Sequence, residues 1–375
     1  MSTNFLLTPT TPLTLPTLRT LLASTARVVA PDSNSASADT TATGSAALLQ
    51  ATACGVGAEV PGELVRLMLL LHAGQQQRRG ASAATVRRLL DFYNREVLPV
   101  VYQQGGEQVA LAHLSLPLFG LGEVNYQGYR LQAYDVLELF GWAPLPQADA
   151  DVPALLAGSG FTLAYAVRSW LRAEHLLWMA DSLSAAAQNQ ADSAPTSPHT
   201  ACHAALAYVQ QSLEEALTTP PTPTNQQNAD TNQLATTGAS LALRTLLLMV
   251  AELGSHSARR TERLLRSAGS ALASLRHPVE SLQQQSAQLC AVAPTGTAAD
   301  VALCTYQLLD YVDQLLGIEL LVISRQPAEQ LPATAQLLLD AREQLPALTE
   351  QQLLYPTVHA AAQFVRRYAR PEQAA

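Results

Sequence analysis

The strongest helical pattern in the chain is the stretch Val60-Pro61-Gly62-Glu63-Leu64-Val65-Arg66-Leu67-Met68-Leu69-Leu70. Pro61 suits the first turn of a helix, because proline fixes a helical φ and needs no hydrogen-bond acceptor there. The apolar residues that follow recur at helical spacing and form one face: Leu64, Leu67, Met68 and Leu71. We therefore predict a helix that begins at Pro61 and is closed by Gly80.

A second helix is predicted directly after Gly80. Ser82 is a good N-cap residue, Pro99 lies near the end of the helix, and one stripe carries Val86, Leu89, Leu90, Tyr93 and Val97. Further along the chain, the same periodicity predicts helices over about 161–187, 201–217, 240–253 and 300–323, with shorter ones near 333–343 and 358–368. The fold class we expect is all-α, an elongated bundle of long antiparallel helices with few or no strands.

The 375 residues are expected to form one helical domain. It would have a smaller N-terminal part (1–135), a central helical bundle (150–330) and C-terminal helices (331–375). Three polar segments interrupt the helical patterns, near 31–45, 188–200 and 218–237. Such segments cannot bury enough apolar area to offset the entropy lost on ordering, so we predict flexible loops there.

Charge and cysteine content exclude several classes of protein. The formal net charge is −8 and the sequence contains no lysine, so we expect no nucleic-acid binding. The most apolar stretches are short and carry charged residues, so no membrane span is expected. No secretory signal pattern is seen at the start, and no cysteines form a C-x-x-C pair among Cys54, Cys202, Cys290 and Cys304. We therefore expect a cytoplasmic protein.

Generic motifs predict neither a nucleotide site nor a metal site. A phosphate loop of the Walker type needs a lysine, which the chain lacks. The best metal-like cluster is His199-Thr-Ala-Cys202-His203, whose two imidazoles would share one helix face. No carboxylate or third ligand is apparent nearby, so we interpret it as a polar helix start and predict no metal. Arg259-Arg260 is interpreted as part of a solvated helix face.

Three stretches of sequence together resemble a known family. The first contains Gly55-Val-Gly57 and 60–70, and runs to Asn94-Arg95-Glu96-Val97-Leu98-Pro99-Val100-Val101. The second is Leu111-Ala112-His113-Leu114-Ser115-Leu116-Pro117-Leu118-Phe119-Gly120, and the third is Ala251-Glu252-Leu253-Gly254-Ser255 with Arg259-Arg260. In order and spacing they are similar to the aromatic amino-acid ammonia-lyases of the histidine, phenylalanine and tyrosine ammonia-lyase type.

The resemblance implies an almost wholly helical fold and a homotetramer whose active sites are built from several subunits. It also implies a reaction, the elimination of ammonia from histidine, phenylalanine or tyrosine. The electrophile of the family is a methylidene-imidazolone, which forms from an internal Ala-Ser-Gly and withdraws electrons from the substrate. A tyrosine on an N-terminal loop serves as the base.

This chain departs from the family where that chemistry is carried out. The ungapped match places Gln104-Gly105-Gly106-Glu107 where the family has Ala-Ser-Gly-Asp, and Gly105 has no hydroxyl to eliminate. The loop with the tyrosine base should fall between Val29 and Leu48, an interval without tyrosine. The family's Asn-Gly-Thr corresponds to Ala157-Gly158-Ser159, so its Asn is replaced by Ala157. We therefore predict no methylidene-imidazolone, no other cofactor and no catalytic residue.

These departures favour a pseudoenzyme, a structural or regulatory partner that forms a homo-oligomer or assembles with an active ammonia-lyase paralogue. Two alternatives stay open. One is a working carbon–nitrogen lyase with an atypical site, in which Glu107, His113 and Tyr102 do acid–base work. The other is a small-molecule binding module that uses the remnant pocket. The candidate pocket residues are Tyr102, His113, Ala157, Gly158 and Ser159.

Overall fold

The computed structural model describes residues 4–24, 26–31, 46–146, 152–188, 199–219, 238–267, 270–292, 296–326, 336–346 and 353–370. These fall into two units. Unit 1 comprises Met1–Arg168, Gln211–Leu241 and Ala298–Leu303, and unit 2 comprises Ser169–Gln210, Ala242–Thr297 and Cys304–Ala375. Most of each predicted loop lies outside the described residues.

The helix pair predicted around residues 60–99 is present in unit 1 as α3 (Gly62–Arg78) and α4 (Ala83–Arg95). Gly80 has a φ of +77°. The Ser82 hydroxyl accepts a hydrogen bond from the Thr85 N–H at 3.2 Å, which confirms the predicted N-cap. Val97, predicted on the stripe of α4, lies beyond the end of that helix but is buried with the stripe.

Short strands, which the apolar periodicity did not predict, also occur in unit 1. β1 (Asn4–Leu6) pairs in parallel with β2 (Arg27–Val29). β3 (Val56–Glu59) pairs with β5 (Tyr102–Gln104), and β6 (Glu123–Tyr126) pairs with both β4 (Leu98–Pro99) and β7 (Tyr129–Gln132), all antiparallel. Each strand has two to four residues, too few for a period-2 pattern to stand out in the sequence.

Unit 1 contains further helices besides α3 and α4. They are α1 (Leu15–Ala23), α2 (Ala46–Thr52), α5 (Gly106–Ser115), α6 (Ala133–Leu139) and α7 (Val152–Leu156), together with the 3-10 turn η1 (Leu116–Phe119). The first turns of α8 (Gly160–Gln188) also belong to this unit. α5 contacts α2, α7 and η1, so it lies inside the unit rather than at its edge.

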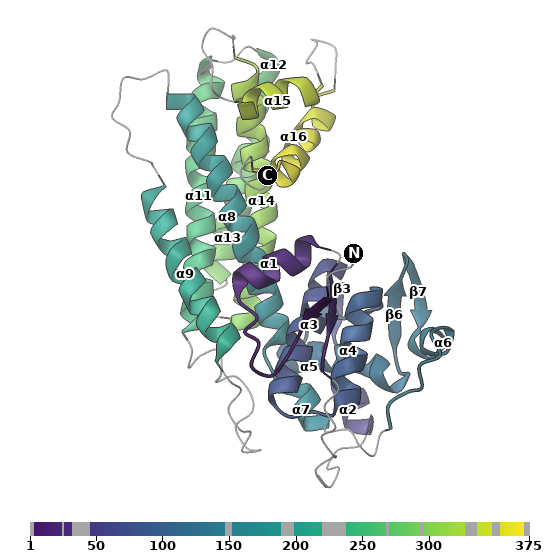
Figure 1. Cartoon of the computed structure of the whole chain (residues 1–375). Coiled ribbons are helices and arrows are strands. Elements are labelled where there is room, and N and C mark those ends of the chain that lie inside the picture. Colours follow the sequence, from purple (N-terminus) through teal and green to yellow (C-terminus); the bar gives the residue numbers. More distant parts are fainter. Residues whose placement is uncertain are drawn as a thin grey trace. The chain divides into compact units, whose positions relative to one another are not determined.

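The described part of unit 2 consists of helices, and its long helices run roughly along one another (Figure 1). Those predicted from periodicity are α8, α9 (Thr200–Thr218), α11 (Ala239–Ser267), α14 (Ala298–Ser324), α15 (Gln336–Gln344) and α16 (Tyr355–Arg367). Two further helices, α12 (Ser270–Ala273) and α13 (Arg276–Val292), were not predicted. The all-α fold class is confirmed, since the strands are few and short.

The end predicted for the helix after residue 240 is wrong. It was placed at about Leu253. Instead α11 continues to Ser267. A Cβ at Gly254 would lie 3.1 Å from Val312 Cγ2 on α14, so this glycine allows two helices to approach closely. The absence of a side chain at this position therefore serves helix packing.

The apolar stripe of α14 is covered within the chain itself. Its residues are at most 1% exposed: Leu308, Leu309, Val312, Leu315, Leu316 and Leu320. On α11, Leu247 and Val250 are also buried, whereas Leu241 and Leu248 are 60% and 59% exposed. The stripe of α14 therefore needs no second subunit to cover it. Within the described residues, no helix has the length and apolar character needed to cross a membrane.

Candidate functional site

The segment from Gln104 to Glu107 forms the tight turn between β5 and α5. Gly105 has φ +141° and ψ −12°, a conformation that essentially only glycine adopts. A Cβ at this position would lie 2.6 Å from Cγ1 of Val109, one turn further along α5. Gly106 follows with φ +79°, but a Cβ added there would meet no atom within 4 Å. The turn therefore requires glycine at Gly105 for two separate reasons.

Glu107, in the first turn of α5, caps the N-terminus of α8. Its Oε1 accepts a hydrogen bond from the Phe161 N–H at 2.7 Å. Its Oε2 accepts from the Thr162 N–H at 2.9 Å and from the Thr162 hydroxyl at 2.6 Å. A carboxylate at this position satisfies N–H groups that have no acceptor within the helix, and it interacts favourably with the helix dipole. Burial raises the pKa of Glu107 to about 6, although these three hydrogen bonds lower it.

This pKa predicts that stability depends on pH through Glu107. The folded state holds the proton more tightly than the unfolded state, whose pKa is near 4.5. The contribution of Glu107 to the free energy of unfolding should therefore fall by about 2 kcal/mol in all as the pH rises from below 4.5 to above 6. Buried His72, whose pKa is lowered to about 3, contributes a rise over the same range, so the Glu107 contribution is read as a difference between variants. Urea unfolding at several pH values between about 4 and 7 measures the free energy of unfolding. In Glu107→Gln the free energy of unfolding should therefore increase more with pH than it does in the wild type, while Glu138→Gln, at an exposed carboxylate of α6, should keep the wild-type slope. An unchanged slope in Glu107→Gln would refute this assignment.

Tyr102 and His113 form a second group of predicted residues, together with Gly55. The Gly55 N–H donates to His113 Nε2 at 3.0 Å, so this nitrogen is an acceptor and neutral His113 carries its proton on Nδ1. Burial lowers the pKa of His113, which favours the neutral form. The rings of Tyr102 and His113 meet edge to face, with centroids 5.3 Å apart, and the Tyr102 hydroxyl accepts a hydrogen bond from Arg130 at 3.1 Å.

Ala157, Gly158 and Ser159 connect α7 to α8. Side chains from the end of α3 form hydrogen bonds with this connection. Gln75 Nε2 donates to the Ser159 hydroxyl at 3.1 Å, and the Ser159 N–H donates back to Gln75 Oε1 at 3.4 Å. Gly158 has φ +149°, and a Cβ there would lie 2.6 Å from Gln75 Oε1. The Arg79 guanidinium donates to the Ala157 carbonyl. Sequence reasoning missed Gln75 and Arg79, because nothing in their own segment indicates a partner so distant in the chain.

The structure thus brings the predicted residues together in two groups joined by α5. Glu107 and 157–159 lie at the start of α8, while Tyr102 and His113 lie beside Gly55. Leu111 of α5 reaches the first group, with Cδ1 3.5 Å from a Cβ built at Gly158. The polar groups named above pair with one another or with backbone. Among the described residues of this arrangement we find no nucleophile hydrogen-bonded to a base, the geometry that covalent catalysis requires.

The cluster at His199 proves to be part of a buried network in unit 2. A carboxylate does lie nearby: Asp181 Oδ1 is 2.8 Å from His199 Nδ1, and Asp181 Oδ2 is 2.7 Å from His203 Nε2. Burial opposes ionisation of Asp181, but its hydrogen bonds with the two histidines hold its pKa below the ordinary value. No group of three potential metal ligands occurs among the described residues. Both histidines therefore form hydrogen bonds with Asp181 at the start of α9.

Arg260 extends this network into the core, so its interpretation as a solvated residue is wrong. It is only 7% exposed and donates to His199 Nε2 at 3.1 Å. Its guanidinium also binds the fully buried Glu319 of α14, with Nε–Oε1 at 2.6 Å and Nη2–Oε2 at 3.0 Å. Ser257 donates to the same carboxylate at 2.6 Å. Nothing in the sequence around either residue indicates this pair, because its members lie on different helices.

Comparison with known proteins shows the family of this chain. The model of the family described as aromatic amino acid lyase matches residues 30–217. The chain belongs to that family. It is 37% identical over 145 residues to histidine ammonia-lyase of Geobacillus sp. (strain WCH70), and 37% identical over 141 residues to that of Bacillus cereus (strain ATCC 10987 / NRS 248). These matches cover 37% and 36% of this chain, and 28% of each relative's length.

Solved structures show the same fold over nearly the whole chain. Histidine ammonia-lyase from Trypanosoma cruzi superposes with a TM-score of 0.80 at 18% identity, covering 97% of this chain and 93% of that one. Tyrosine aminomutase from Streptomyces globisporus superposes with a TM-score of 0.81 at 14% identity, covering 97% of both chains. At such identities the likeness establishes the fold alone.

Proposed function

We propose that this chain is a non-catalytic member of the aromatic amino acid lyase family that serves as a structural or regulatory partner. The observation that carries the proposal is the turn at Gln104-Gly105-Gly106-Glu107, which stands where the family resemblance places Ala-Ser-Gly-Asp. If this chain were active, its relatives' names indicate a carbon–nitrogen lyase acting on an amino acid.

The residues of this turn do not fit a methylidene-imidazolone. Ring formation needs a serine hydroxyl that can be eliminated, and the corresponding residue is Gly105. The backbone there has φ +141°, and a side chain would approach Val109 to 2.6 Å. A serine would therefore be strained at this position as well as absent from it. The turn is built for glycine, which supports a protein that makes no such group.

The residues that an atypical lyase would use are already committed to structural contacts. Both oxygens of Glu107 accept hydrogen bonds at the start of α8, and Nε2 of His113 accepts one from the backbone of Gly55. A general base needs a lone pair directed at the substrate. Gln75 likewise fills the space beside Gly158 and pairs with Ser159, which argues against a ligand pocket at this place. We therefore favour the pseudoenzyme over both alternatives.

A partner role draws on the family's assembly from several subunits, as the resemblance implies. Exposed apolar side chains on α11 support it, since Leu241 and Leu248 are 60% and 59% exposed and lie two helical turns apart on one face. The partner we propose is a second copy of this chain or an active ammonia-lyase paralogue.

Two measurements on the purified full chain test this function. Ammonia release from histidine, phenylalanine and tyrosine should be absent, and any turnover above a no-protein blank would contradict the non-catalytic assignment. Light scattering should show a species larger than the 40.0 kDa single chain, or co-expression with an active ammonia-lyase should yield a stable complex. A monomer that fails to bind the active enzyme would contradict the partner role.

A further inference from the structure

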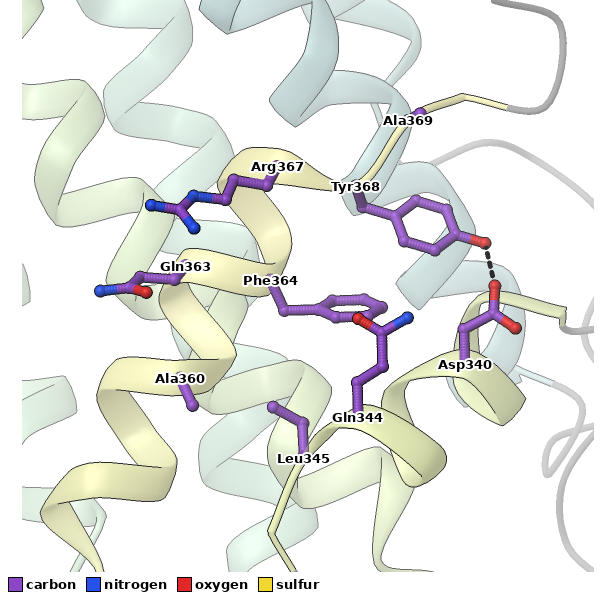
Figure 2. A pocket seen from close by; sticks show the side chains of 9 residues that line it. All are labelled: Asp340, Gln344, Leu345, Ala360, Gln363, Phe364, Arg367, Tyr368 and Ala369. Atoms are coloured by element: carbon purple, nitrogen blue, oxygen red, sulfur yellow. Dashed lines mark hydrogen bonds between the residues drawn. The ribbon is translucent and has the colours of Figure 1, made fainter. Parts of the chain in front are cut away.

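A pocket of about 490 Å³ lies between α15 and α16 in unit 2 (Figure 2). This volume lies in the range of small-molecule sites. The lining includes one acidic, one basic and two aromatic side chains with two amides, namely Asp340, Arg367, Phe364, Tyr368, Gln344 and Gln363. None of these residues belongs to the candidate site described above. The mixture of opposite charges and aromatic surface sets this pocket apart from a simple apolar groove.

Asp340 is a carboxylate that two neutral donors hold in place. Tyr368 donates its hydroxyl proton to Oδ2 at 2.7 Å, and Gln336 Nε2 donates to Oδ1 at 2.6 Å. Burial, followed by this hydrogen bond, raises the pKa of Tyr368 to about 12, so the phenol remains a proton donor at neutral pH. Across the described part of the chain, no cationic side chain forms an ion pair with Asp340. Each carboxylate oxygen therefore keeps acceptor capacity for a ligand cation.

The Arg367 guanidinium has no hydrogen-bond or ion-pair partner among the described residues, in contrast to three nearby arginines. Arg366 binds Asp310 and Asp313, Arg342 binds the Ser324 carbonyl, and Arg370 binds the Glu174 carbonyl. Figure 2 shows the Arg367 guanidinium on one side of the Phe364 ring and the Asp340–Tyr368 pair on the other. The two opposite charges line one pocket but do not neutralise each other.

We propose that this pocket binds a small zwitterion whose ammonium and carboxylate groups lie at opposite ends of a flat apolar body. The ammonium would bind Asp340 and the carboxylate would bind Arg367. The apolar body would lie between them, against the small part of Phe364 that is not buried, because this residue is 8% exposed. Charge-assisted hydrogen bonds at both ends would fix the orientation of the ligand. Amino acids with a terminal amine, and short peptides, share this chemistry. The inference is independent of the proposed function.

Isothermal titration calorimetry on the full chain tests the site with 4-(aminomethyl)benzoate as the probe. Saturable binding at one site per chain is expected. Benzylamine lacks the carboxylate and 4-methylbenzoate lacks the ammonium, so each should bind roughly tenfold or more weakly. L-phenylalanine carries both charges on one carbon and should also bind more weakly. The proposal would be overturned if the wild-type chain showed no saturable binding of the probe, or if benzylamine bound as tightly as the probe.

Substitutions in the pocket test whether the probe binds there. Asp340→Asn and Arg367→Gln keep the shape but remove one charge each, so each should weaken binding of the probe roughly tenfold or more. Glu343→Gln on α15 and Arg263→Gln on α11 remove exposed charges outside the lining and should leave the affinity unchanged. Circular dichroism melting of every variant shows whether the fold is kept. Wild-type affinity in both pocket variants would overturn the assignment.

Discussion

Glu319→Ala is expected to lower the free energy of unfolding by about 3–5 kcal/mol, the typical loss when one partner of a buried ion pair is removed. Glu319 is fully buried, and its carboxylate binds both Arg260 and Ser257. Alanine would leave the Arg260 guanidinium in the core with His199 as its remaining described partner. Urea unfolding followed by circular dichroism measures the loss.

Two further variants separate burial from charge. Arg27→Ala breaks an exposed ion pair with Asp91, at 4.0 Å, and should cost less than about 1 kcal/mol. The double variant Arg260→Met with Glu319→Leu removes both charges and should recover much of the lost stability, because no unpaired charge remains. A loss below about 1 kcal/mol for Glu319→Ala would show that water reaches this pair, contrary to the structure.

Gly105→Ser is the second substitution with a large expected effect. It places a side chain on a backbone with φ +141° and brings its Cβ to 2.6 Å from Val109. The strain and the overlap should together cost more than about 2 kcal/mol. Thermal melting of the full chain provides the measurement.

The neighbouring glycine supplies the matched control. Gly106 also has a positive φ, but a Cβ there meets nothing within 4 Å. Gly106→Ser should therefore show the conformational cost alone, and it should be less destabilising than Gly105→Ser. Val109→Ala added to Gly105→Ser should restore part of the stability by removing the overlap. Equal losses for the two serine variants would mean that the turn accommodates a side chain at Gly105.

The helices were predictable because their apolar residues recur with the period of the α-helix. α8 was expected over 161–187 and spans Gly160–Gln188, and α14 was expected over 300–323 and spans Ala298–Ser324. The same periodicity was followed only to about Leu253 in α11, which continues to Ser267. The close approach of Gly254 to Val312 of α14 could not be predicted, because the two residues lie on different helices.

The roles of individual polar residues could be predicted less well. The sequence indicated Glu107 as part of a remnant loop. Its role as the cap of α8 depends on Phe161 and Thr162, which lie more than fifty positions further along the chain. Arg260 was grouped with the adjacent Arg259 as solvated, yet its burial depends on Glu319, 59 positions away. Local sequence reports helix periodicity directly, whereas a buried polar residue is explained only by its tertiary partner.

The intact mass of the purified chain tests the absence of the family's electrophile most directly. Formation of a methylidene-imidazolone expels two water molecules, so the modified chain is lighter than its sequence requires. We predict the unmodified mass, and an unmodified peptide spanning Tyr102 to Val109 after digestion. A deficit of two water molecules located in that peptide would contradict the assignment of this chain as a non-catalytic member of the family.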